Sequence, residues 1–136
     1  MNTLQQDLIY SIDRLKKLEH LQNTDFFYTV FWRDNIQRWI EEEKLSSENL
    51  RRQIIAHMEN KEENTERKQK LEQVLTIHDK ECLNVNRYHY CLKQNAAEKD
   101  ILSLADEISK NRHELSLLLH SLNCRTLDDL CLRPQI

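Results

Sequence analysis

Hydrophobic residues recur at steps of three and four along most of the chain. Between residues 3 and 22 they form one stripe, made of Leu4, Leu8, Ile12, Leu15 and Leu18. This spacing places side chains on one face of a helix, and it continues through most of the remaining sequence. The pattern predicts helices at 3–22, 24–58, 65–94, 96–122 and 127–132.

The same pattern predicts the fold class. No segment alternates β-branched with polar residues between turn signals, so we expect no strand. We therefore predict an all-α protein that forms one helical domain over residues 1–136. Its architecture is expected to be an antiparallel helical bundle with short coiled-coil segments, built from three to four long helices and a short C-terminal helical turn.

Polar side chains mark the expected helix ends. Residues 23–25, Asn-Thr-Asp, offer capping groups and predict a break. Asn95 with Glu98 three residues later fits a capping box, which predicts a helix that begins at Ala96. Thr126 with Asp129 resembles a further cap, before a short turn that Pro134 ends.

The stretch 59–70 contains no apolar residue and reads ENKEENTERKQK. It is either a polar connection between antiparallel helices or part of one long helix in solvent. Asn60, Asn64 and Thr65 favour a turn, because their short side chains compete for backbone hydrogen bonds.

Two stripes of residues, here called seams, are expected to pair the later helices. The first contains Leu71, Leu75, His78, Cys82, Val85, His89, Leu92 and Ala96. The second contains Ile101, Ala105, Ile108, Arg112, Leu115, Leu119 and Leu122. The seams contain the polar residues His78, His89 and Arg112, and the stretch 59–70 contributes no apolar residue. Both features favour short coiled-coil stretches over one continuous rod.

Composition excludes several function classes. The 136 residues include no glycine and one proline, which argues against phosphate-binding loops, dinucleotide fingerprints and nucleophile elbows. The net charge is −3 and acidic and basic residues are finely mixed, so we expect no nucleic-acid partner. No apolar run has the ~20 residues of a membrane span. No catalytic motif is present, and we predict no enzymatic activity and no small-molecule substrate.

The N-terminal residues lack a basic segment followed by an apolar one, so we do not expect a signal peptide. The four cysteines, which have no zinc-ribbon spacing, are then expected to be reduced thiols. This predicts a cytoplasmic or nuclear location, with association with the cytoskeleton as one expectation.

Six of the nine aromatic residues lie within fourteen positions, at Phe26, Phe27, Tyr28, Phe31, Trp32 and Trp39. At 100° per residue they point all round a helix, so that helix must be buried on several sides. They either form the protein's own core or present one side to a partner. Under the second interpretation the candidate protein-binding residues are Phe27, Phe31, Trp32 and Trp39, because large aromatic side chains dominate binding hot spots.

Two His-x-x-x-Cys pairs, His78 with Cys82 and His120 with Cys124, could supply four zinc ligands from two antiparallel helices. Free cysteines are more often small buried residues, and histidines often lie beside helix seams. We therefore predict neither a metal site nor a cofactor.

Together these patterns predict a non-enzymatic structural subunit of a larger intracellular assembly, of the cytoskeletal, ciliary, centrosomal or kinetochore type. Its partners would be other helical protein chains, in a homo- or hetero-oligomer joined by helix–helix and coiled-coil packing. The alternative is a self-sufficient helical adaptor that binds one protein partner through its aromatic surface. We assign the chain to no family.

Overall fold

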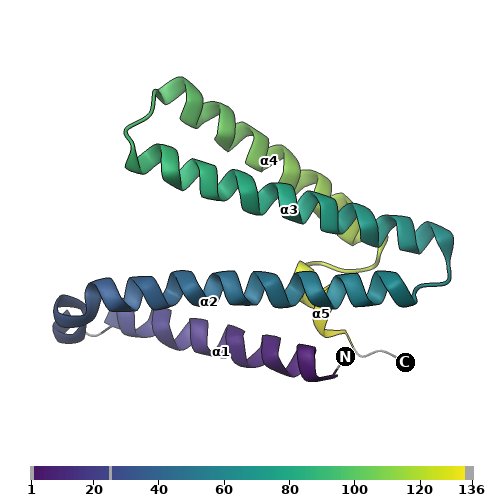
Figure 1. The fold of residues 1–136 in the computed structure, drawn as a ribbon, viewed down its shortest axis with the longest axis horizontal. Helices are drawn as coiled ribbons and strands as arrows, with labels where there is room; N and C mark the ends of the chain where they lie inside the picture. Colours follow the sequence, from purple (N-terminus) through teal and green to yellow (C-terminus); the bar gives the residue numbers. More distant parts are fainter. Residues whose placement is uncertain (1, 25, 134–136) are drawn as a thin grey trace. The chain divides into compact units, whose positions relative to one another are not determined.

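Five helices account for nearly all of the described structure. The computed structural model describes the backbone of residues 2–24 and 26–133, and the side chains of residues 3–23 and 33–133. The helices are α1 (Asn2–Thr24), α2 (Phe26–Lys61), α3 (Thr65–Lys93), α4 (Glu98–Ser121) and α5 (Leu127–Leu132), drawn in Figure 1. No strand occurs in these ranges. The prediction of an all-α helical bundle is confirmed, and each helix end lies within three residues of its predicted position.

The chain divides into two compact units, Met1–His57 and Met58–Ile136, with the boundary inside α2. The prediction that residues 1–136 form a single domain stays a prediction. Each unit is described below by itself.

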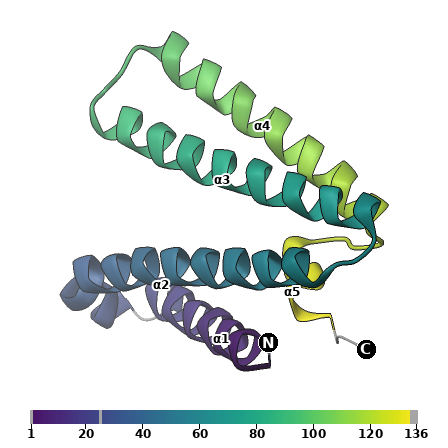
Figure 2. The ribbon, with the colours of Figure 1, turned by 45° about the vertical axis from the view of Figure 1, so that its right-hand side comes forward.

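In the first unit, α1 runs antiparallel to the N-terminal part of α2 (Figures 1 and 2). Gln22 Nε2 donates a hydrogen bond of 2.7 Å to Gln37 Oε1 across the two helices. Among the residues of this unit whose side chains are described, those fully or nearly fully buried are Leu8, Ser11, Ile36, Ile40, Ser47, Ile54 and Ile55.

Two of these buried residues are serines, one on each helix. Ser11 lies on the same face of α1 as Leu8 and Leu15, although it is not one of the predicted stripe residues. Ser47 Oγ, on α2, donates to the carbonyl of Lys44 at 2.9 Å, which satisfies its hydroxyl inside its own helix. Both side chains are small, so they allow close approach of a neighbouring backbone at these positions.

In the second unit, α3 and α4 pack against each other in antiparallel directions. Arg112 Nε donates to Glu81 Oε1 at 2.8 Å, which shows the register of the two helices. Because both helices rise equally per residue, this register places Leu115 level with His78 and Leu119 level with Val74. The predicted seam residues His78, Leu115 and Leu119 are buried here. Val74, which is also buried, lies outside the predicted stripe, whose own residue Leu75 is only partly buried.

Burial falls along the α3–α4 hairpin. Leu71, Val74, Leu119 and Leu122 are at most 4% exposed, whereas the seam residue Leu92 is 45% exposed. Figures 1 and 2 both show the two ribbons spreading apart toward the connection at residues 94–97. The predicted seam thus forms a tight core only at the end that leads to α5.

The polar stretch 59–70 contains a break, as its asparagines predicted. Helix α2 ends at Lys61 and α3 begins at Thr65. Asn64 caps α3, because its Oδ1 accepts a hydrogen bond of 3.1 Å from the backbone N–H of Arg67. Glu62 accepts from the Arg67 guanidinium at 3.0 Å and joins the two sides of the connection.

The capping box predicted at Asn95 and Glu98 is wrong. Asn95 has φ +50° and follows the C-terminus of α3, where the N–H of Ala96 donates to Cys91 O at 3.0 Å. These are the features of a Schellman motif, in which a left-handed residue ends a helix. Helix α4 begins at Glu98, not Ala96, and its N-cap Ala97 makes no side-chain cap.

Asn123 ends α4 in the same way. Its φ is +61°, and the N–H of Cys124 donates to Leu119 O at 2.8 Å. In most proteins glycine occupies such left-handed positions, and asparagine is the usual substitute. A chain without glycine therefore uses asparagine at both of these helix ends.

The cap predicted at Thr126 is confirmed. Its hydroxyl accepts a hydrogen bond of 3.0 Å from the backbone N–H of Asp129, and the Asp129 carboxylate accepts from the N–H of Arg125. Leu130 and Cys131 of α5 are buried. Pro134, the predicted terminator, lies outside the described residues.

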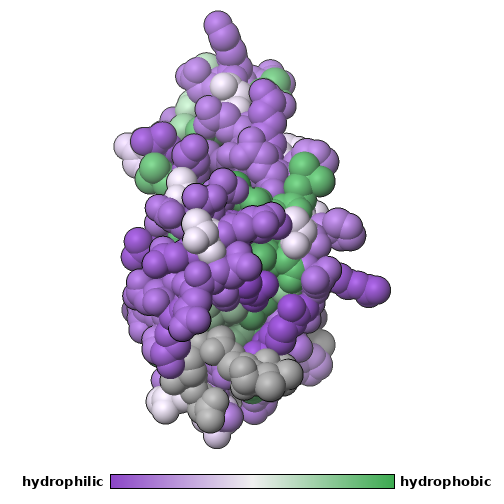
Figure 3. Space-filling view, turned by 90° about the vertical axis from the view of Figure 1, so that its right-hand side faces the viewer, coloured by the Kyte–Doolittle hydropathy of each residue, from purple (hydrophilic) through white to green (hydrophobic). Residues whose placement is uncertain are grey.

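The surface of the described residues is mixed in character. On the face drawn in Figure 3, hydrophilic residues predominate and hydrophobic ones appear in gaps between them. Among the described residues, no helix has the length and hydrophobicity needed to cross a bilayer.

Candidate interaction surface

The structure describes one of the four predicted protein-binding residues. Phe27, Phe31 and Trp32 lie outside the residues whose side chains are described. Trp39 lies on the N-terminal part of α2, with the buried residues Ile36 and Ile40 as helical neighbours, and it is 40% exposed. Its indole is thus partly packed and partly available at the surface.

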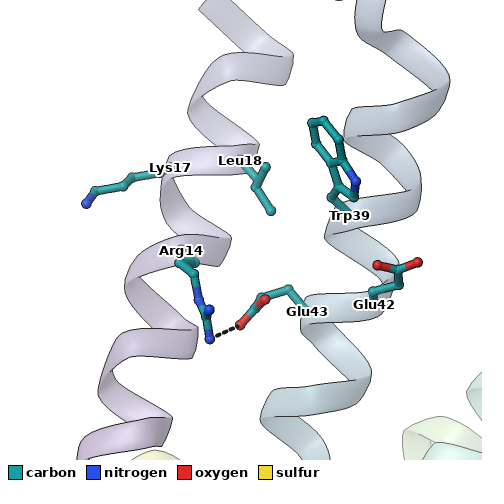
Figure 4. A pocket seen from close by; sticks show the side chains of 6 residues that line it. All are labelled: Arg14, Lys17, Leu18, Trp39, Glu42 and Glu43. Carbon is teal, nitrogen blue, oxygen red and sulfur yellow. Dashed lines mark ion pairs between the residues drawn. The ribbon is translucent and has the colours of Figure 1, made fainter.

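Trp39 lies at an open pocket of about 330 Å³ between α1 and α2. The pocket is lined by Arg14, Lys17, Leu18, Trp39, Glu42 and Glu43. Figure 4 shows the side chains of Leu18 and Trp39 pointing toward each other from the two helices. They form the apolar centre of the pocket, and charged residues surround it.

The charges are divided between the two helices. Arg14 and Lys17 give α1 a cationic edge, and Glu42 and Glu43 give α2 an anionic edge. Arg14 and Glu43 form an ion pair of 3.3 Å across the pocket, and the Glu43 side chain is only 16% exposed. In Figure 4, Lys17 and Glu42 extend away from the pocket on opposite sides.

The two outer charges have partners within their own helices. Lys17 Nζ lies 3.0 Å from Asp13 Oδ2, and Arg38 Nε lies 3.9 Å from Glu42 Oε1. Both are exposed pairs, which contribute little to stability because water screens them. Lys17 and Glu42 can therefore turn toward an incoming partner at little cost.

The apolar surface continues along α1. Tyr10 and Leu21 are 58% and 42% exposed. They share a helix face with Arg14 and Lys17, because these positions follow steps of four, three and four. We call this surface the Trp39 flank, and it comprises Tyr10, Arg14, Lys17, Leu18, Leu21, Trp39, Glu42 and Glu43.

Sequence reasoning found Trp39 but missed the charged residues of the Trp39 flank. The signal that selects them is the pairing of α1 with α2, because only this pairing places Arg14 beside Glu43. Both helices carry many charged residues, so sequence spacing alone does not distinguish Arg14, Lys17, Glu42 and Glu43 from the others.

The two His-Cys pairs lie in the second unit. Cys82 Sγ is 3.7 Å from His78 Nε2, as expected for positions one helical turn apart. The α3–α4 register places His78 level with Leu115, five residues from His120. His120 is exposed, and Cys124 Sγ donates to the carbonyl of Leu122 at 3.5 Å. The structure does not bring the four hypothetical zinc ligands together.

The four cysteines are all free thiols, and Cys124 and Cys131 are buried. Burial raises the pKa of the Cys124 thiol above its ordinary value, and the nearby Arg133 guanidinium opposes the shift. Cys124 is therefore a neutral, unreactive thiol near neutral pH.

Comparison of the chain with protein-family models, with curated proteins and with solved structures gives no match. A function is therefore inferred from the residues of the chain itself.

Proposed function

We propose that this chain is a non-enzymatic structural subunit of a larger intracellular assembly, and that it binds other helical chains through the Trp39 flank. The observation that carries the proposal is the partial exposure of Trp39 at an open pocket between two packed helices.

Trp39 exposes a substantial apolar area at the pocket. A large aromatic side chain buries roughly 150–250 Å² when it is fully covered. Tyr10 and Leu21 add further exposed apolar surface on the same side of α1. Soluble proteins rarely keep a contiguous apolar patch in water unless a partner covers it. An amphipathic helix that lies between α1 and α2 would cover Leu18 and Trp39 together.

The character of the pocket also favours a protein partner over a substrate. It is open, and its walls combine two apolar side chains with four charged ones. Binding hot spots typically have this arrangement, an aromatic anchor surrounded by polar residues.

The free thiols support an intracellular, reducing location, because such thiols tend to form disulfides in secreted proteins. Placement in a cytoskeletal, ciliary, centrosomal or kinetochore assembly rests on analogy with other helical subunits. A self-sufficient adaptor is the second candidate. It is favoured by the Arg14–Glu43 ion pair, which organises the pocket before any partner binds.

The test is co-purification of partners from cells that express the tagged chain. Trp39→Ala should reduce the recovered partners about tenfold or more, the loss typical of a hot spot. Leu45→Ala is the matched control, because Leu45 lies on the same helix, away from the pocket, and is 63% exposed. Circular dichroism should show both variants to be as helical as the wild type.

Two results would refute the proposal. One is the same set of partners, in the same amounts, with Trp39→Ala as with the wild type. The other is an equal loss with Leu45→Ala, because the Trp39 flank would then have no special role. The isolated chain separates the two candidates, since an adaptor should be a compact, well-folded species and a structural subunit should be partly molten or poorly soluble.

A further inference from the structure

We infer that one occupant of the Trp39 flank is a second copy of this chain, related to the first by a two-fold axis through the pocket. The inference rests on the proposed function and names a partner for the same surface. What favours a second copy over an unrelated helix is the division of charge between α1 and α2.

A two-fold axis that runs parallel to both helices, along the mouth of the pocket, exchanges their positions. It places α1 of the second copy over α2 of the first, and α2 of the second copy over α1 of the first. The cationic edge formed by Arg14 and Lys17 then faces the anionic edge formed by Glu42 and Glu43, and this happens twice. A surface that complements itself in this way is the requirement for a symmetric dimer.

The apolar residues occupy the positions that such a dimer would bury. Trp39 and Leu18 lie at the centre of the pocket, beside the axis, so each would meet its counterparts. The product is a four-helix arrangement with an aromatic centre and charged edges, the general plan of a protein interface.

The outer charges Lys17 and Glu42 give the sharpest test, because both are exposed and neither contributes to the Arg14–Glu43 ion pair. Sedimentation equilibrium of the full chain measures its dimerisation at low ionic strength. Lys17→Glu places an acidic side chain opposite Glu42 of the other copy, and Glu42→Lys places a basic side chain opposite its Lys17. Each variant alone should dimerise about tenfold more weakly, since like charges now face each other twice.

An equimolar mixture of the two variants should form a heterodimer as tight as the wild-type dimer, because residues 17 and 42 of opposite charge then face each other at both contacts. Recovery in the mixture also shows that both variants are folded. Added salt should reduce the differences between these samples, since the charges lie at exposed edges.

The matched controls are Lys16→Glu and Glu41→Lys, which reverse exposed charges beside the same positions but outside the pocket. Both should dimerise like the wild type, whereas Trp39→Ala should weaken the dimer about tenfold or more.

A wild-type chain that is monomeric up to sub-millimolar concentration would overturn the inference, and so would a mixture no tighter than its components. The proposed function would survive either result if Trp39→Ala still removes other partners in co-purification. If the dimer forms but Trp39→Ala removes no other helical chain in co-purification, the proposed function fails and the dimer inference stands.

Discussion

Replacement of Asn123, the left-handed residue at the end of α4, tests how a chain without glycine terminates its helices. Asn123 has φ +61°, and its N–H donates to His120 O at 3.0 Å. A non-glycine residue in this conformation typically loses roughly 1–2 kcal/mol, because its Cβ approaches the following carbonyl oxygen. Asparagine loses less than other residues, because its short polar side chain can hydrogen-bond locally.

The expected changes in unfolding free energy follow from how well each residue tolerates the left-handed conformation. Asn123→Ala should lower the free energy of unfolding by about 1 kcal/mol, because alanine pays the left-handed penalty without compensation. Asn123→Gly should leave it unchanged or raise it by up to about 1 kcal/mol, since glycine has no penalty but a more flexible unfolded state. The expected order of stability at this position is glycine, then asparagine, then alanine. Urea unfolding followed by circular dichroism measures it.

Asn86 is the control, because it is an exposed asparagine within α3. There the order should reverse, with alanine more stable than asparagine by a few tenths of a kcal/mol and glycine less stable by a similar amount. If alanine is better tolerated than glycine at residue 123 as well, the left-handed C-terminus of α4 is refuted.

Burial in the second unit leads to four further predictions. Leu119→Ala should cost about 2–5 kcal/mol of unfolding free energy in urea, and the exposed Leu117→Ala less than about 0.5 kcal/mol; equal losses would contradict the assigned core. Amide hydrogen exchange should be faster over residues 85–104, where few side chains are buried, than at the end of the α3–α4 hairpin near α5. Uniform protection would contradict this, because it would show that the hairpin is equally well packed along its length. Iodoacetamide should label Cys124 more slowly than Cys91, which is only partly buried. Because burial raises the pKa of Cys124 in the folded state, stability should fall as the pH rises above the ordinary pKa of a thiol, and Cys124→Ala should remove that part of the slope.

The helices and their breaks could be predicted from the sequence because each has a local cause. Hydrophobic spacing identifies the helices, and the caps at Asn64 and Thr126 are made by neighbouring residues. Asn95 was misread for the same local reason. An asparagine caps a following helix or ends a preceding one, and the residues around it are compatible with both. Which applies depends on the backbone conformation, which sequence alone does not give.

The candidate site could be predicted only in part. Trp39 was identifiable because a large aromatic residue among helical positions is conspicuous. Its charged neighbours were not, because Arg14 and Glu43 meet only when α1 pairs with α2 in one register. The uneven burial of the α3–α4 seam is equally non-local. His78 and His89 lie on one predicted stripe, yet His78 is buried and His89 is exposed.

The central claim is that a protein partner covers Trp39 when the chain is part of its native assembly. Hydroxyl-radical footprinting, read by mass spectrometry at Trp39, measures this directly in the native assembly and in the dilute isolated chain. We expect several-fold slower oxidation of Trp39 in the assembly, with the exposed Leu45 of the same helix as internal reference. Equal oxidation of Trp39 in both samples would contradict it.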